Sequence, residues 1–214
     1  MSIELQHINV KLLLKDADTL DHEHDLDPII PVFHSWIQAQ SFDELLLDVA
    51  DYRHVQAGPG VLIIGHEADY SLDHTDGRWG VRYNRKTVTA GTNQDRLAQA
   101  ALAALIATAR IQEDTRLNRK LSFNSHDIEI FVNDRALAPN TEATRQAVKS
   151  EFQAFAERLF GGREYSLAFG EDARRLLGVS LRSSLAFTVE ELIANLQSAA
   201  GNRVREEKVA QGGN

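Results

Sequence analysis

The chain has 214 residues, a formal net charge of −8 from 23 basic and 31 acidic residues, and no cysteine. This length and a hydrophobic content of 43% predict a globular domain with its own core rather than a disordered chain. The absence of cysteine excludes disulfides, thiolate nucleophiles and cysteine-based metal sites. Because the negative charge repels phosphate backbones, we expect no nucleic-acid partner.

No segment approaches the roughly 18 to 20 consecutive apolar residues that a membrane-spanning helix requires. The N-terminal sequence MSIELQHINVKLLLKD lacks the basic flank, long apolar stretch and small-residue cleavage site of an export signal. We therefore expect a soluble cytoplasmic protein without a membrane partner.

The first third of the chain predicts two strands and a short helix. Residues 6–14 alternate between apolar and polar side chains, which is typical of a half-buried strand with Asn9 and Lys11 on its polar face. A short helix is expected around Phe33 and Trp36, after two prolines. Residues 45–49 are apolar on both faces, which favours a central strand, and a Gly-Pro-Gly turn follows.

The dipeptide Asp76-Gly77 predicts a tight hairpin between two strand-like segments, because both of its positions tolerate positive φ. Counting back from this turn fixes the register and gives one apolar and one polar face. The apolar face pairs Leu72 with Val81, Tyr70 with Tyr83, and His74 with Trp79. The polar face pairs Ser71 with Arg82, Asp69 with Asn84, and Glu67 with Lys86. Residues 61–73 are taken as one strand, with Gly65 able to form a bulge.

The remainder of the chain, from residue 92 onward, predicts three helices and further strands. An alanine-rich helix begins at Thr92 or Asn93 and runs to about residue 114. Two short strands or a second hairpin surround Asn124-Ser125, and an amphipathic helix begins at Asn140 or Thr141 and ends at Gly161-Gly162.

Two more alternating segments and a capping box complete the predicted pattern. Tyr165 to Phe169 and Leu177 to Leu181 read as strands, and Thr188 with Glu191 forms the capping box of a last helix. The polar residues 200–214 are expected to form a disordered tail.

These elements predict an α+β fold, with an antiparallel sheet and helices packed on one side. Residues 1–199 are expected to form a single compact domain. Its possible halves are 1–115, with the order β-α-β-β-β-α, and 116–199, with the order β-β-α-β-β-α. Both resemble variations on one β-α-β-β-α unit and suggest a duplication, although no residue-level repeat accompanies it.

The polar residues around the Gly-Pro-Gly turn are the first candidates for a site: Asp48, Asp51, His54, His66 and Glu67. Carboxylates and imidazoles together can bind a divalent ion or serve as an acid and a base. The alternative interpretation makes His66 a core histidine and Glu67 a partner of Lys86. Catalytic residues, a metal and a cofactor all remain unassigned from the sequence.

Trp79 and Tyr83 on the apolar face of the hairpin are further weak candidates for binding. The hydroxyl of Tyr83 requires a polar partner or water at one end of that face. No G-x-S-x-G, S-x-x-K, G-x-x-x-x-G-K or G-x-G-x-x-G motif occurs. The sequence therefore favours a non-enzymatic binding or assembly protein, with a homo-oligomer or a protein partner possible. The alternative is a metal-dependent hydrolase or other enzyme that uses the Asp48, Asp51, His54, His66 and Glu67 cluster.

Overall fold

The computed structural model describes residues 3–15, 17–19, 24–117 and 121–198. Eight strands form one antiparallel sheet in the order β2-β3-β4-β5-β1-β6-β8-β7. The strands are β1 (Ile8–Leu14), β2 (Leu46–Tyr52), β3 (Gly60–Gly65), β4 (Ala68–Asp73), β5 (Gly80–Arg85), β6 (Phe123–Val132), β7 (Tyr165–Phe169) and β8 (Leu177–Ser183).

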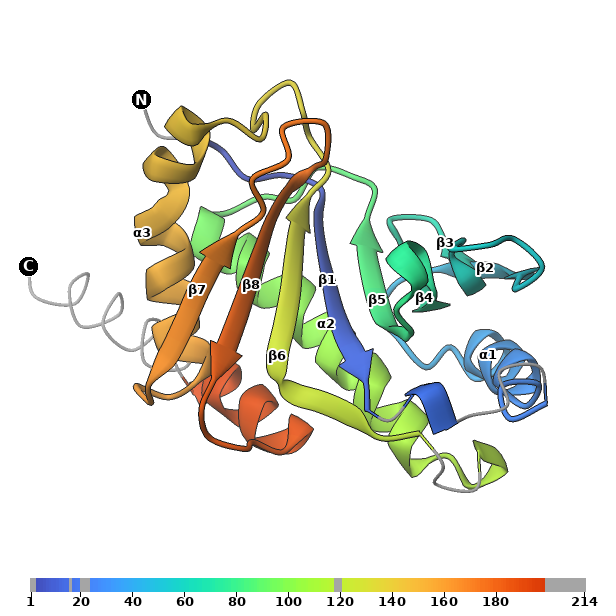
Figure 1. Ribbon diagram of the computed structural model, residues 1–214. Helices are drawn as coiled ribbons and strands as arrows, with labels where there is room; N and C mark the ends of the chain where they lie inside the picture. The colour runs from blue at the N-terminus through green and yellow to red at the C-terminus, as the bar shows by residue number, and fades with distance from the viewer. Residues whose placement is uncertain (1–2, 16, 20–23, 118–120, 199–214) are drawn as a thin grey trace, which may run out of the picture.

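The helices and the antiparallel sheet confirm the predicted α+β fold. In Figure 1, α2 lies behind the central strands β1 and β6. The α-helices are α1 (Ile29–Gln38), α2 (Asn93–Glu113), α3 (Glu142–Leu159) and a further helix over residues 189–198. Short 3-10 helices cover Ala17–Thr19, Thr75–Gly77 and Thr115–Leu117. Within the described ranges, no helix is long and apolar enough to cross a membrane.

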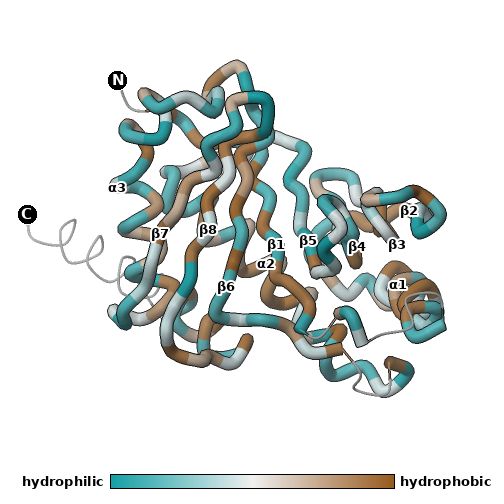
Figure 2. The backbone as a smooth tube through the Cα atoms, viewed as in Figure 1, coloured by the Kyte–Doolittle hydropathy of each residue, from teal (hydrophilic) through white to brown (hydrophobic). Residues whose placement is uncertain are grey.

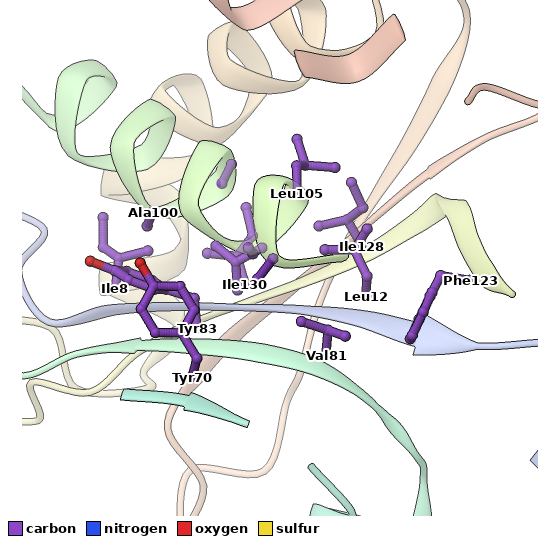
Figure 3. Close-up of a cluster of buried hydrophobic side chains, with 14 of the residues drawn as sticks. Ile8, Leu12, Tyr70, Val81, Tyr83, Ala100, Leu105, Phe123, Ile128 and Ile130 are labelled. Atoms are coloured by element: carbon purple, nitrogen blue, oxygen red, sulfur yellow. The ribbon is translucent and has the colours of Figure 1, made fainter. Parts of the chain in front are cut away.

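The core lies between the sheet and α2. Side chains from the central strands point toward the alanine-rich face of α2 (Figure 3), and Val10, Leu12 and Ile130 have no exposed surface. The predominantly hydrophobic α1 lies beside β2 and β3 (Figures 1 and 2) and buries Phe33 and Trp36. The opposite face of the sheet carries charged side chains such as Lys11, Arg82 and Glu129, which pair across β1, β5 and β6. Over the described residues, no α-helix covers this face in Figure 1.

The hairpin of β4 and β5 has the predicted register, with Tyr70 opposite Tyr83 and Leu72 opposite Val81. Both turn residues, Asp76 (φ 62°) and Gly77 (φ 71°), adopt positive φ. The predicted ion pair between Glu67 and Lys86 is wrong, because each of these residues pairs with a different side chain. Arg85 instead binds Glu67 at 2.9 Å, and Lys86 binds Asp69 at 2.7 Å.

The prediction of one continuous strand over residues 61–73 is wrong, because the chain turns at His66 and Glu67 to form β3 and β4. The turn packs closely: a Cβ atom on Gly65 would lie 2.2 Å from the Ala68 carbonyl oxygen. The turn also changes the alternation of faces. Ile63 of β3 lies opposite Tyr70 of β4, whereas a continuous strand would place Ile64 on the same face as Tyr70.

Two other strand predictions also differ from the structure. The strand expected to be central is the edge strand β2, in which Leu47 is 53% exposed; Leu45, just before it, is 61% exposed. The two short strands expected around Asn124-Ser125 are instead the single long strand β6. A run of apolar residues identifies a strand, but the neighbours that cover it come from elsewhere in the chain.

The predicted helix starts are confirmed by their caps. Thr92 and Asp95 form a capping box for α2, Thr141 caps α3, and Thr188 and Glu191 exchange hydrogen bonds at the start of the last helix.

The proposed duplication is not confirmed. In each half the first strand pairs with the last, but the first half supplies five strands and the second supplies three. The segment 200–214, predicted as a disordered tail, lies outside the described residues.

Candidate functional site

A groove of about 1000 Å³ lies between α2 and the segment that joins α1 to β2. One wall is a single stripe of α2, spaced three and four residues apart, and consists of Asp95, Ala98, Gln99, Leu102, Ala103 and Ile106. The other wall includes Phe42, Glu44, Leu45, His66, Glu67, Tyr70 and Arg85. The short alanine side chains of α2 leave room between the two walls.

Aromatic contacts hold the outer wall against the sheet. The Phe42 ring lies 5.2 Å from the Trp36 ring of α1 and 4.7 Å from the Tyr70 ring of β4. Arg110 of α2 stacks over the Phe42 ring and donates a hydrogen bond to the Ser41 carbonyl oxygen. These contacts connect the joining segment to α1, β4 and α2 at once, so the groove has a preformed wall.

Glu44 is the polar centre of this wall. Its Oε1 atom accepts hydrogen bonds from the hydroxyls of Tyr70 and Tyr83, each at 3.2 Å. Gln99 of α2 donates to the Tyr83 hydroxyl at 2.9 Å. The Oε2 atom of Glu44 is buried and has no hydrogen-bond partner in the described part of the chain. A carboxyl group, two phenols and an amide therefore form one connected network.

Burial changes the protonation of this network. Desolvation raises the pKa of Glu44, although the hydrogen bonds from Tyr70 and Tyr83 oppose that rise. Burial also raises the pKa of Tyr83 to about 12, and the pKa of Tyr70 is raised by burial and by the nearby Glu44 carboxyl. Burial therefore disfavours the charged form of each of these three groups.

Glu44→Gln is expected to stabilise the protein increasingly as the pH rises. The unfolded chain ionises Glu44 near its ordinary pKa of 4.5, whereas the folded chain retains the proton to a higher pH. The wild type therefore loses stability as the pH rises through this interval, and a Gln side chain does not titrate. Thermal unfolding from pH 3.5 to pH 8 should show a widening advantage for Glu44→Gln, of order 1 kcal/mol at pH 8.

The exposed neighbour Asp43 supplies the control for this measurement. Asp43→Asn removes a carboxylate outside this network and should give no comparable stabilisation at pH 8. A difference between Glu44→Gln and the wild type that stays constant with pH would contradict a raised pKa for the half-buried Glu44.

Three of the predicted site residues lie on or just beyond β2, away from the groove. Asp48 and Asp51 are exposed and three residues apart on a strand, so their side chains point to opposite faces. The guanidinium of Arg53 donates to both oxygens of Asp51 and lowers the pKa of that carboxyl. The His54 ring stacks on Tyr52. In the described ranges, no group of three or more His, Asp or Glu side chains is placed to hold a metal ion.

His66 and Glu67 do line the groove, from the turn between β3 and β4. His66 is exposed there, so its interpretation as a core histidine is wrong. Glu67 forms an ion pair with Arg85, which also lines the groove.

Trp79 and Tyr83 occupy different ends of the helix-facing side of the hairpin. Trp79 is 5% exposed and stacks on His74 with ring centroids 4.3 Å apart, within the core. Tyr83 is fully buried, and its hydroxyl reaches Glu44 and Gln99, which is the polar partner that the sequence required.

Glu44, Arg85 and Gln99 were missed from the sequence. The unmet hydrogen-bond requirement of the Tyr83 hydroxyl was the only signal that pointed to such partners. The residues that meet this requirement lie 39 and 16 positions away in the chain. Local spacing does not connect residues at such separations.

Comparison with known proteins gives no relative: no family model, curated protein or solved structure matches the chain.

Proposed function

We propose that the protein is a binding protein for a small organic molecule with an apolar body, which occupies the groove beside α2. The observation that carries this proposal is the convergence of an apolar helix stripe with the network of Glu44, Tyr70 and Gln99 in one large groove. Binding sites for small molecules commonly combine apolar walls with a few polar groups that fix the orientation of the ligand.

The engagement of the polar groups favours binding over catalysis. Arg85 forms an ion pair with Glu67. Gln99 donates a hydrogen bond to the Tyr83 hydroxyl, which in turn donates to Glu44. Such groups are held in fixed positions, which suits recognition of a ligand. No observation on the described residues favours the alternative of a metal-dependent hydrolase.

The test is binding of the neutral fluorescent probe Nile red to the full-length protein, measured by fluorescence titration. Ala103→Trp places a large ring on the groove wall and should weaken binding by about tenfold or more, which is over 1.4 kcal/mol. Ala154→Trp introduces the same ring at an exposed position of α3 and should leave the affinity unchanged.

If Nile red binds Ala103→Trp as tightly as the wild type, the groove is excluded as the binding site. If neither Nile red nor any of a panel of neutral and charged amphiphiles shows saturable binding to the wild type, the proposed function is wrong.

A further inference from the structure

A second pocket lies on the other face of the sheet, the one without helices. Its volume is about 140 Å³, and four cationic side chains line it together with two carboxylates and an aromatic ring. These residues are Lys11, Arg78, Arg82, Arg175, Asp76, Glu129 and Phe131. The pocket lies across the sheet from the groove beside α2, so it is independent of the function proposed above.

Three of the four cations are already engaged with the protein. Lys11 uses its three N–H donors on Asp73 (2.5 Å) and on the carbonyl oxygens of Thr75 (3.3 Å) and Arg78 (2.7 Å). The other two engaged cations are arginines.

The guanidinium of Arg78 binds Glu129 through two hydrogen bonds of 2.6 and 2.9 Å. Arg175 forms an ion pair with Asp76, which brings the loop between β7 and β8 against the turn between β4 and β5.

Arg82 is the exception. Its side chain is only 19% exposed, and its guanidinium lies 5.5 Å from the centre of the Phe131 ring. Its nearest ion-pair contact, with Asp73 Oδ2, is 3.8 Å long, too far for a hydrogen bond. The buried Nε atom has no partner in the part of the chain that the structure describes, where no hydrogen bond from the other guanidinium nitrogens is found either.

The stacking of Arg82 on Phe131 does not remove the need for acceptors. A cation–π contact uses the flat face of the guanidinium, whereas its five N–H donors point outward in the plane. Buried polar groups are almost always hydrogen-bonded, so a largely buried guanidinium with unused donors at the wall of a pocket indicates a binding function.

We propose that Arg82 binds an oxyanion, the phosphate or carboxylate group of a ligand, in this pocket. The planar fork of a guanidinium matches two oxygens of such a group. With Asp73 included, four cations face three carboxylates, so the pocket retains a positive charge in a protein of net charge −8. An adjoining pocket of about 200 Å³, bordered by Gly170, Ser180 and the carboxylates Glu171 and Asp172, offers room for the remainder of the ligand.

The experiment titrates the full-length protein with sodium phosphate and, separately, with sodium acetate, at constant ionic strength in chloride. The Nε–H resonance of Arg82 is followed by ¹H–¹⁵N NMR and assigned by its disappearance in Arg82→Gln. We expect a saturable shift with at least one anion, and at least a tenfold loss of affinity in Arg82→Gln, measured on other pocket resonances. Arg82→Lys, which retains the charge but not the fork, should bind with intermediate affinity.

Arg182→Gln is the matched control. Arg182 lies on the same face of the sheet but outside the pocket, and its guanidinium already donates to Asp127 at 3.1 and 2.5 Å. Tighter binding of phosphate would assign a phosphorylated ligand, and tighter binding of acetate a carboxylic acid. The proposal is overturned if neither anion saturates the shift, or if Arg82→Gln and Arg182→Gln reduce the affinity equally.

Discussion

Replacing Asp73 with Asn is expected to lower the free energy of unfolding by about 3 to 5 kcal/mol. The side chains of Lys11 and Asp73 are 3% and 2% exposed, and their charged atoms are 2.5 Å apart. Asn has the size of Asp and can still accept the hydrogen bond from the Thr75 N–H, so the change removes mainly the charge. The loss arises because Lys11 remains buried without the carboxylate to which it is hydrogen-bonded.

Urea unfolding of three variants checks this expectation. Lys11→Met combined with Asp73→Asn should recover much of the loss, since a buried ion pair replaced on both sides is often nearly neutral. Glu142→Gln, which removes an exposed ion pair on α3, should leave the stability nearly unchanged. A loss below about 1 kcal/mol for Asp73→Asn would contradict a buried charge on Lys11.

The same variant predicts a pH dependence with a definite sign. Burial lowers the pKa of Lys11, and the charge of Asp73 opposes that change. Without Asp73, the folded protein releases the Lys11 proton at a lower pH than the unfolded chain does. The stability of Asp73→Asn therefore rises as the pH increases. The difference in free energy of unfolding between Asp73→Asn and the wild type should become smaller between pH 7 and pH 10.

The parts of the fold that could be predicted from the sequence depend on neighbours in the chain. Asp76-Gly77 fixed the hairpin register because the two positive φ angles are properties of those residues alone. Thr92 and Thr141 marked helix starts in the same way, since a cap bonds to an amide three residues away.

The parts that could not be predicted depend on distant segments. Lys11 alternates with apolar residues and was placed on a polar, solvated face, but Asp73 and Arg78 from the hairpin enclose it. Arg82 was likewise only a polar position opposite Ser71, and its pocket requires Glu129 and Arg175. Glu44 carried no local signal, because both of its phenol partners come from the hairpin.

Replacing Gly60 with Ala is expected to cost about 3 kcal/mol or more, from two separate causes. Gly60 adopts a φ of +65°, which penalises any residue with a Cβ atom by roughly 1 to 2 kcal/mol. A Cβ atom at this position would also lie 2.0 Å from the Leu72 carbonyl oxygen and 3.0 Å from the Trp79 ring. Because Leu72 belongs to the neighbouring strand β4, relieving this overlap would disturb the pairing of β3 with β4.

Gly77→Ala separates the two causes. Gly77 has a φ of +71°, but a Cβ atom there would have no neighbour within 4 Å, so only the cost of the backbone conformation applies. The free energy of unfolding, measured in urea, should therefore be much lower in Gly60→Ala than in Gly77→Ala. Trp79 fluorescence should change only in Gly60→Ala. If the two variants lose the same free energy of unfolding, then β3 and β4 can move apart without an energetic penalty. In that case the β3–β4 turn, which supplies His66 and Glu67, could not act as a rigid wall of the groove.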